Sequence, residues 1–150
     1  MNKKGSVITV YLRLALGIGF LVPGLDRLGC WGPPGGAQIS WGDWAHFVSY
    51  ARTVMSFLPV RLADGMAVVA TTGELLFGVL LVAGYLTRWA ALGSGLLLLG
   101  FGVSMAVSFG IVSPLSYSVF TASAAALLLA KAGPYPYSVD ALLRRKRGRP

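Results

Sequence analysis

Long apolar runs, separated by short polar segments, dominate this chain. Four runs are close to or above the roughly 20 residues that a helix needs to cross a bilayer. They extend over residues 6–28, 60–86, 89–109 and 114–132. The last three runs are joined by very short connections, so consecutive helices must lie antiparallel to each other. The pattern predicts an all-α fold, a transmembrane four-helix bundle that forms one domain over residues 1–150.

The only long connection, residues 29–58, predicts an amphipathic helix outside the membrane. Its first part is rich in turn residues. Helical periodicity then begins after Asp43, which we expect to be the N-cap. The apolar face of this helix comprises Trp44, Phe47, Val48, Ala51, Met55 and Leu58. We expect it to lie on the outer surface with its tryptophan at headgroup level, or to cap the bundle.

Basic residues indicate how the helices are oriented. Lys3 and Lys4 precede the first run, Arg88 lies in the turn between the second and third, and a basic tail over 133–150 follows the fourth. The positive-inside rule then places both termini in the cytoplasm. Beside apolar helices such a tail indicates contact with anionic lipid, so the bilayer is the expected partner and nucleic acid is not.

Composition supports a membrane protein and excludes several kinds of site. The chain is 55% hydrophobic and only 12% charged, with a formal net charge of +8, whereas a soluble domain is about one quarter charged. Its single cysteine excludes an internal disulfide. One histidine and one cysteine are too few for a protein zinc site or a bis-histidine haem. No nucleotide-binding or nucleophile motif is present, so we expect no metal and no catalytic residues.

Two charges of opposite sign lie well inside the predicted spans. Glu74 is near the midplane of its helix, where an ionised carboxylate costs at least ~2.5–3.5 kcal/mol. Arg13 lies in the antiparallel first run, at an axial offset that we estimate as about 5–8 Å from the helical rise. A guanidinium can span that offset. We therefore predict a buried pair of Arg13 with Glu74, with Thr71 one turn away as a hydrogen-bond partner.

Three roles for this pair stay open. It could fix the register of two helices, form the floor of a pocket for a quinone-like head group, or belong to a proton relay. Tyr117 and Thr121 share a face of the fourth run, where they could line such a pocket or pack in the core.

A polar mouth is predicted at the outer end of the bundle. Its residues are Asp26, Arg27, Asp64, Trp44 and His46. We expect Asp26 and Arg27 to be solvated charges at a helix end. Asp64 could pair with Arg27 or Arg61, while Trp44 and His46 would cap the mouth. His46 is expected to be a surface histidine.

Three segments carry motifs in a recognisable order: YLRLALGIGFLVPGLDRLG at 11–29, GELLFGVLLVAGYLTRWAAL at 73–92, and YSVD at 137–140. Together they resemble the DoxX family, from its opening to its closing region, where Val139 stands in place of leucine. The resemblance covers the whole chain. It implies a four-helix, multi-pass protein of a bacterial or archaeal cytoplasmic (inner) membrane. The family takes its name from a small subunit of an archaeal terminal oxidase system that oxidises thiosulfate with quinone.

The resemblance implies an accessory subunit of a quinone-linked redox system rather than a self-contained enzyme. It would work beside a redox partner subunit, with quinone as a non-covalent cofactor. Two alternatives remain: a carrier or channel-like bundle for a small molecule, and a purely structural membrane scaffold. Family membership predicts architecture better than function.

Overall fold

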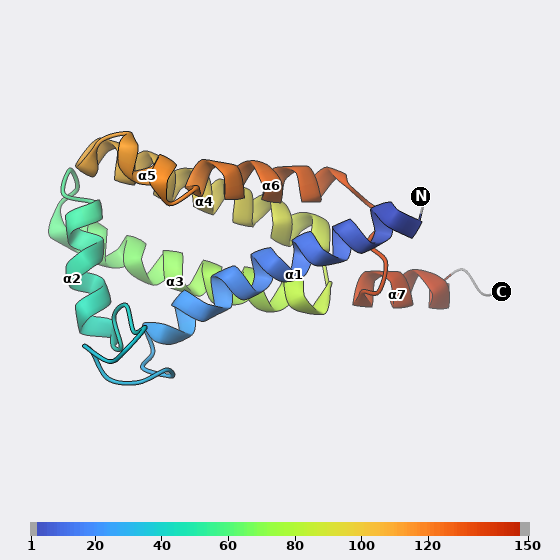
Figure 1. Cartoon of the computed structure of the whole chain (residues 1–150), viewed down its shortest axis with the longest axis horizontal. Coiled ribbons are helices and arrows are strands. Elements are labelled where there is room, and N and C mark those ends of the chain that lie inside the picture. Colours follow the sequence, from blue (N-terminus) through green and yellow to red (C-terminus); the bar gives the residue numbers. More distant parts are fainter. Residues whose placement is uncertain (1–2, 148–150) are drawn as a thin grey trace.

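A computed structural model describes residues 3–147, and every regular element within that range is a helix (Figure 1). The lengthwise helices are α1 (Lys3–Asp26), α3 (Val60–Ala83), α4 (Thr87–Phe109) and α6 (Val119–Lys131). The shorter helices are α2 (Trp44–Val54), α5 (Val112–Ser116) and α7 (Val139–Arg147). The start of α1 and all of α7 lie at one end of the bundle, and α2 lies at the other (Figure 1).

Three helices are long and apolar enough to cross a membrane: α1 over Val7–Asp26, α3, and α4. The all-α fold and the first three predicted spans are therefore confirmed. The fourth predicted span, 114–132, is not one continuous helix, because α5 and the 13-residue α6 replace it. The chain breaks at Ser118, whose φ of 55° is left-handed. That conformation costs an L-residue roughly 1–2 kcal/mol and interrupts the helical hydrogen bonds.

The helices pack mainly as two pairs, α1 with α3 and α4 with α6. Glycines set the register of the first pair. A Cβ on Gly78 would lie 2.8 Å from the Leu21 side chain and 3.1 Å from the Gly17 carbonyl oxygen. Gly17 therefore lies beside Gly78, and Gly24 beside Leu75. As a result, α1 begins beyond the last turn of α3, and α3 begins beyond the last turn of α1 (Figure 1).

Helix α6 packs on α4 with a buried serine and with large side chains that lie against glycines of α4. Ser123 donates a hydrogen bond of 2.7 Å to the Gly95 carbonyl, and a Cβ on Gly102 would lie 2.6 Å from the Phe120 ring. Tyr117 is 75% exposed and Thr121 is also exposed. The prediction that these two side chains line a pocket or the core is therefore wrong. Hydropathy could not identify the inner face, because lipid-facing and core-facing residues are equally apolar.

Helix α2 lies across the end of the bundle (Figure 1). Asp43 is its N-cap, as predicted, because its carboxylate accepts a 2.8 Å hydrogen bond from the His46 N–H. Phe47 and Ala51 are buried and pack against Ala67 of α3. The predicted amphipathic helix is confirmed, and its apolar face is confirmed in part: Phe47 and Ala51 are buried, Val48 is partly buried, Trp44 is exposed, and Met55 and Leu58 follow the end of the helix.

Candidate functional sites at the two ends of the bundle

A buried ion pair joins the residue that follows α1 to the middle of α3. Arg27 Nη2 donates to Glu74 Oε1 at 3.1 Å, and Arg27 Nη1 lies 2.7 Å from Glu74 Oε2. The same Nη1 donates to the Thr71 hydroxyl at 2.9 Å. Only 6% of the arginine side chain and 4% of the glutamate side chain are exposed. The guanidinium thus lies against both carboxylate oxygens, but it hydrogen-bonds only Oε1, and Oε2 has no hydrogen-bond donor among the described residues.

The predicted pair of Arg13 with Glu74 is therefore wrong. Arg13 Nη2 instead donates to the Tyr137 carbonyl at 2.8 Å, and Nη1 donates to that of Pro136 at 3.5 Å. Arg27 directly follows α1 and is fourteen positions after Arg13, which corresponds to about 21 Å along the helix axis. The register of α1 against α3 is the cause, since it places Arg13 beside Gly84 and Arg27 beside Thr71.

Aromatic rings and a loop cover the pair. The Arg27 guanidinium carbon lies 3.8 Å from the centroid of the Phe47 ring and 5.0 Å from that of Trp41, both within cation–π distance. Asp26 Oδ2 accepts hydrogen bonds from the backbone N–H groups of Ser40 and Trp41, each at 3.0 Å. Asp26 and Arg27 are 4% and 5% exposed. The expectation that they are solvated is wrong, because the loop before α2 folds over them.

The other residues of the predicted mouth form its rim. Asp64 pairs with Arg52, at 2.7 and 2.8 Å, and with neither predicted partner. His46 is a surface histidine, with 61% of its side chain exposed and its ring nitrogen 2.9 Å from Asp43. Hydrogen bonds from the His46 backbone and ring hold the pKa of Asp43 below its usual value. Trp44 is 36% exposed and lines a shallow pocket with Arg52 and Asp64. The centre of the predicted mouth is thus covered, and its exposed polar residues lie only at the rim.

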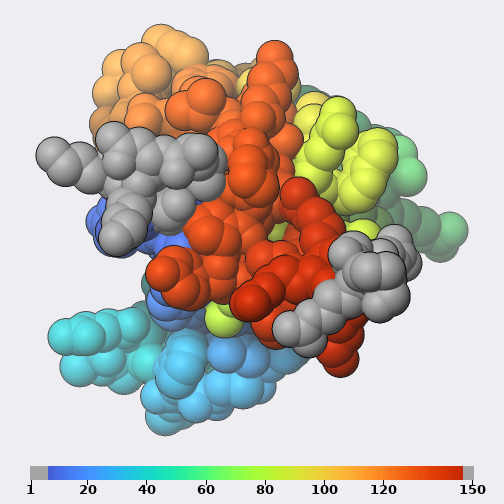
Figure 2. Space-filling view, turned by 90° about the vertical axis from the view of Figure 1, so that its right-hand side faces the viewer, coloured from blue at the N-terminus to red at the C-terminus, as the bar shows by residue number. Residues whose placement is uncertain are grey.

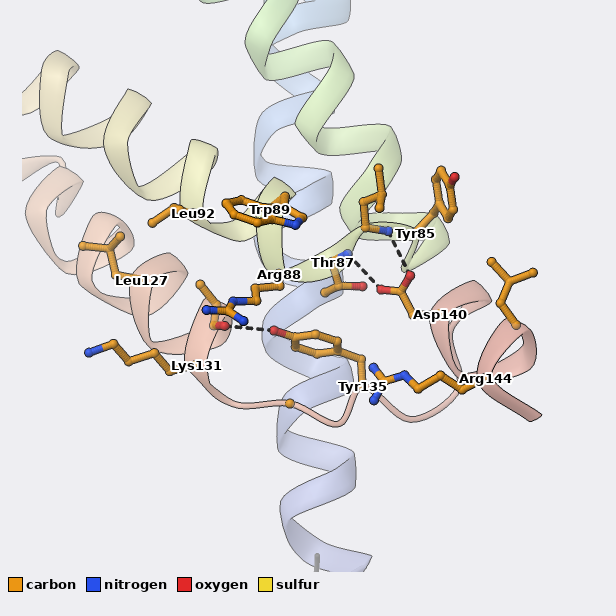
Figure 3. Close-up of a pocket in the computed structure, with 14 residues that line it drawn as sticks. Tyr85, Thr87, Arg88, Trp89, Leu92, Leu127, Lys131, Tyr135, Asp140 and Arg144 are labelled. Carbon is orange, nitrogen blue, oxygen red and sulfur yellow. Dashed lines mark hydrogen bonds between the residues drawn. The ribbon is translucent and has the colours of Figure 1, made fainter. Parts of the chain in front are cut away.

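An open pocket of about 1040 Å³ lies at the opposite end, between the start of α4, the end of α6, and α7. Figure 2 looks onto this end, where α7 (red) lies beside the first residues of α4 (yellow-green). Its apolar wall includes Trp89, Leu92 and Leu127, and its cationic groups are Arg88, Lys131 and Arg144 (Figure 3). The hydropathy pattern and the motifs do not predict this pocket. The available signal was that three helix ends, predicted on one side of the membrane, each carry a basic residue.

Two polar side chains hold the wall of this pocket in place. Asp140 accepts hydrogen bonds from the N–H groups of Leu86 and Thr87, at 3.0 and 2.9 Å, and so caps the start of α4 (Figure 3). Tyr135 is 5% exposed, and its hydroxyl donates to carbonyls at the end of α6. Burial raises the pKa of Tyr135. The closing motif YSVD therefore ties α7 to α4.

The DoxX family model matches residues 8–107, which is two thirds of the 150-residue chain. The matched region contains both members of the buried pair, Arg27 and Glu74. No curated protein and no solved structure matches the chain. Among residues 3–147 no group of three or more His, Cys, Asp or Glu side chains could hold a metal ion.

Proposed function

Since the chain belongs to the DoxX family, we propose that it is an accessory subunit of a quinone-linked redox system in the cytoplasmic membrane of a bacterium or archaeon. In this role it holds a catalytic partner at a fixed position in the membrane and contributes no complete catalytic site. The redox association follows from what the family resemblance implies. The accessory role is supported by the burial of the Arg27–Glu74 ion pair, whose charged groups are already bound to each other and to their neighbours.

The Arg27–Glu74 pair is engaged in structural contacts. Both Nη atoms of the arginine are bound to Glu74 or Thr71, and Phe47 and Trp41 cover the guanidinium. A catalytic or ligand-binding group must be reached by its substrate, and only 6% of the Arg27 side chain and 4% of the Glu74 side chain are exposed. Removing one member of a buried pair typically costs about 3–5 kcal/mol. Each member therefore needs the other in order to stay buried between the end of α1 and α3, which makes the pair a structural contact.

Three membrane-facing surfaces are open to a partner helix. Gly19 on α1, Gly65 on α3 and Gly100 on α4 are exposed, and a Cβ at any of them would meet nothing within 4 Å. In a bilayer, glycine on a helix surface allows a second helix to approach closely. A partner subunit can therefore dock on one of these surfaces without rearranging the bundle.

The test uses the same substitution on each surface: Gly19→Leu, Gly65→Leu and Gly100→Leu. The full chain is purified from its own membranes in a mild detergent, and the size of the assembly, its quinone content and its quinone-reducing activity are measured. We expect one variant to lose the partner and the activity together, while the other two act as matched controls. A wild-type chain that purifies alone, without quinone or quinone-reducing activity, would refute the proposal.

The sealed pair also favours a second candidate, a purely structural scaffold. A scaffold would keep its membrane assembly when the pair is replaced by Arg27→Met with Glu74→Leu, and that assembly would show no quinone chemistry. A carrier or channel needs a water-filled path past Glu74, and the 3% exposure of this residue does not favour such a path.

A further inference from the structure

The pocket between α4, α6 and α7 has an excess of positive charge. Arg88, Lys131 and Arg144 line it, against the single carboxylate of Asp140. Both oxygens of that carboxylate already accept backbone hydrogen bonds from the start of α4. The three basic side chains come from three different helices, and in Figure 3 the guanidinium of Arg88 lies between Lys131 and Arg144. None of the three appears in a salt bridge among the described residues.

The pocket also has apolar lining residues, and the Arg88 guanidinium carbon lies 5.8 Å from the centroid of one of them, the Trp89 ring. Trp89 and Leu92 lie in the first turns of α4, and Leu127 lies in the last turns of α6. Trp89 is 64% exposed. Tryptophan at the end of a spanning helix marks the level of the lipid headgroups. The cationic part therefore lies at headgroup level, and the apolar part extends toward the acyl chains.

Helix α7 lines the pocket on the side where we expect the membrane to end. Leu142 and Leu143 are exposed on a helix that also carries Arg144, Arg145 and Lys146. A short helix with exposed leucines and several cations suits the membrane interface, with its apolar residues toward the lipid. Its attachment through Asp140 holds Arg144 over the pocket.

We propose that this pocket binds one anionic phospholipid. The phosphate lies among Arg88, Lys131 and Arg144, and the upper part of an acyl chain lies along Trp89, Leu92 and Leu127. The volume of about 1040 Å³ accommodates a headgroup with the start of its chains, since pockets for drug-sized ligands measure about 300–1,000 Å³. The apolar wall distinguishes a lipid from free phosphate, because free phosphate would leave that wall empty. This site does not depend on the proposed redox role.

The experiment compares two double variants of the full chain. Lys131→Gln with Arg144→Gln removes two cations from the pocket. Arg145→Gln with Lys146→Gln removes two cations from α7 that do not line it, and is the matched control. Each protein is titrated with phosphatidylglycerol or with phosphatidylcholine of the same acyl chains, and bound lipid is counted by native mass spectrometry. Thermal unfolding verifies that both variants remain folded.

We expect the wild type to bind one phosphatidylglycerol in preference to phosphatidylcholine. The pocket variant should bind it roughly 30-fold more weakly, and the control less than about threefold more weakly. A photoreactive phosphatidylglycerol should crosslink to α4 and α6. If both variants lose the same amount of affinity for phosphatidylglycerol, the lipid is attracted by the basic tail in general, and the proposal is overturned. If neither variant loses affinity, the proposal is also overturned. Displacement of the lipid by millimolar inorganic phosphate would overturn it in favour of a soluble anion site.

Discussion

Replacing Glu74 with leucine leaves the Arg27 guanidinium without its counter-charge, in a place where the arginine is 5% exposed. The two contacts to the carboxylate, at 3.1 and 2.7 Å, are lost. Breaking a buried pair by removing one member costs about 3–5 kcal/mol, so Glu74→Leu and Arg27→Met should each lower the free energy of unfolding by that amount. The double variant removes both charges, and replacement of a whole pair by apolar residues is often neutral. The double variant should therefore lose much less free energy of unfolding than the sum of the losses of the two single variants.

The assay is reversible unfolding in mixed micelles, with helix content followed by circular dichroism. The matched control is Arg13→Met, alone and with Glu74→Leu. Arg13 lies beside Gly84, which is ten positions and about 15 Å from Glu74 along α3, and it binds carbonyls near α7. Effects at sites more than 7–10 Å apart usually add within about 0.3–0.5 kcal/mol. We therefore expect strong coupling between Arg27 and Glu74, and none between Arg13 and Glu74.

The refuting result is equally specific. Coupling of Glu74 to Arg13 that matches or exceeds its coupling to Arg27 would mean that the register of α1 against α3 is wrong. Additive losses in both cycles would mean that the carboxylate is not held by either arginine.

Three further outcomes are expected. Asp140→Ala should lower the free energy of unfolding by about 0.5–2 kcal/mol, because it removes the cap of α4, and Asp140→Asn should restore part of the loss in thermal unfolding. Gly78→Leu should cost about 1–3 kcal/mol by forcing α1 away from α3, whereas Gly100→Leu, at an open position, should leave the melting temperature nearly unchanged. Protonating Asp43 should loosen α2. Its pKa lies below the ordinary 3.8 when folded, so its contribution is complete above pH 3.8 and is lost as the pH falls through the lowered value. Amide exchange at His46 measures this, and exchange that does not accelerate at low pH contradicts it.

Most of the helices could be predicted, because the hydropathy of a segment depends only on the residues of that segment. The first three spans, the cap at Asp43 and the apolar face of α2 follow from local periodicity. The burial of Glu74 with a basic partner also follows, since a charge inside a span needs a counter-charge. The identity of that partner does not follow, because it depends on the axial register between two helices, and neither helix encodes the register by itself.

The register comes from close contacts that sequence patterns do not rank. Gly17, Gly24 and Gly78 allow the backbones of α1 and α3 to approach, and they shift the end of α1 to the level of Glu74. The break at Ser118 could not be predicted from hydropathy either, because the apolar run continues through this residue. The loop before α2 has the composition of a turn region. Its sequence does not indicate that its backbone N–H groups bind Asp26, which places the loop over the buried pair.

The bond between Arg13 and the Tyr137 carbonyl joins residues 124 positions apart. During translation α1 leaves the ribosome first, and domains generally form from the N-terminus onward. Arg13 must nevertheless wait until residues 136–140 have been synthesised before its guanidinium finds its acceptors and Asp140 reaches the start of α4. Completion of this end of the bundle is thus tied to the synthesis of its last helix, and a chain interrupted after α6 would leave the Arg13 guanidinium without these two acceptors.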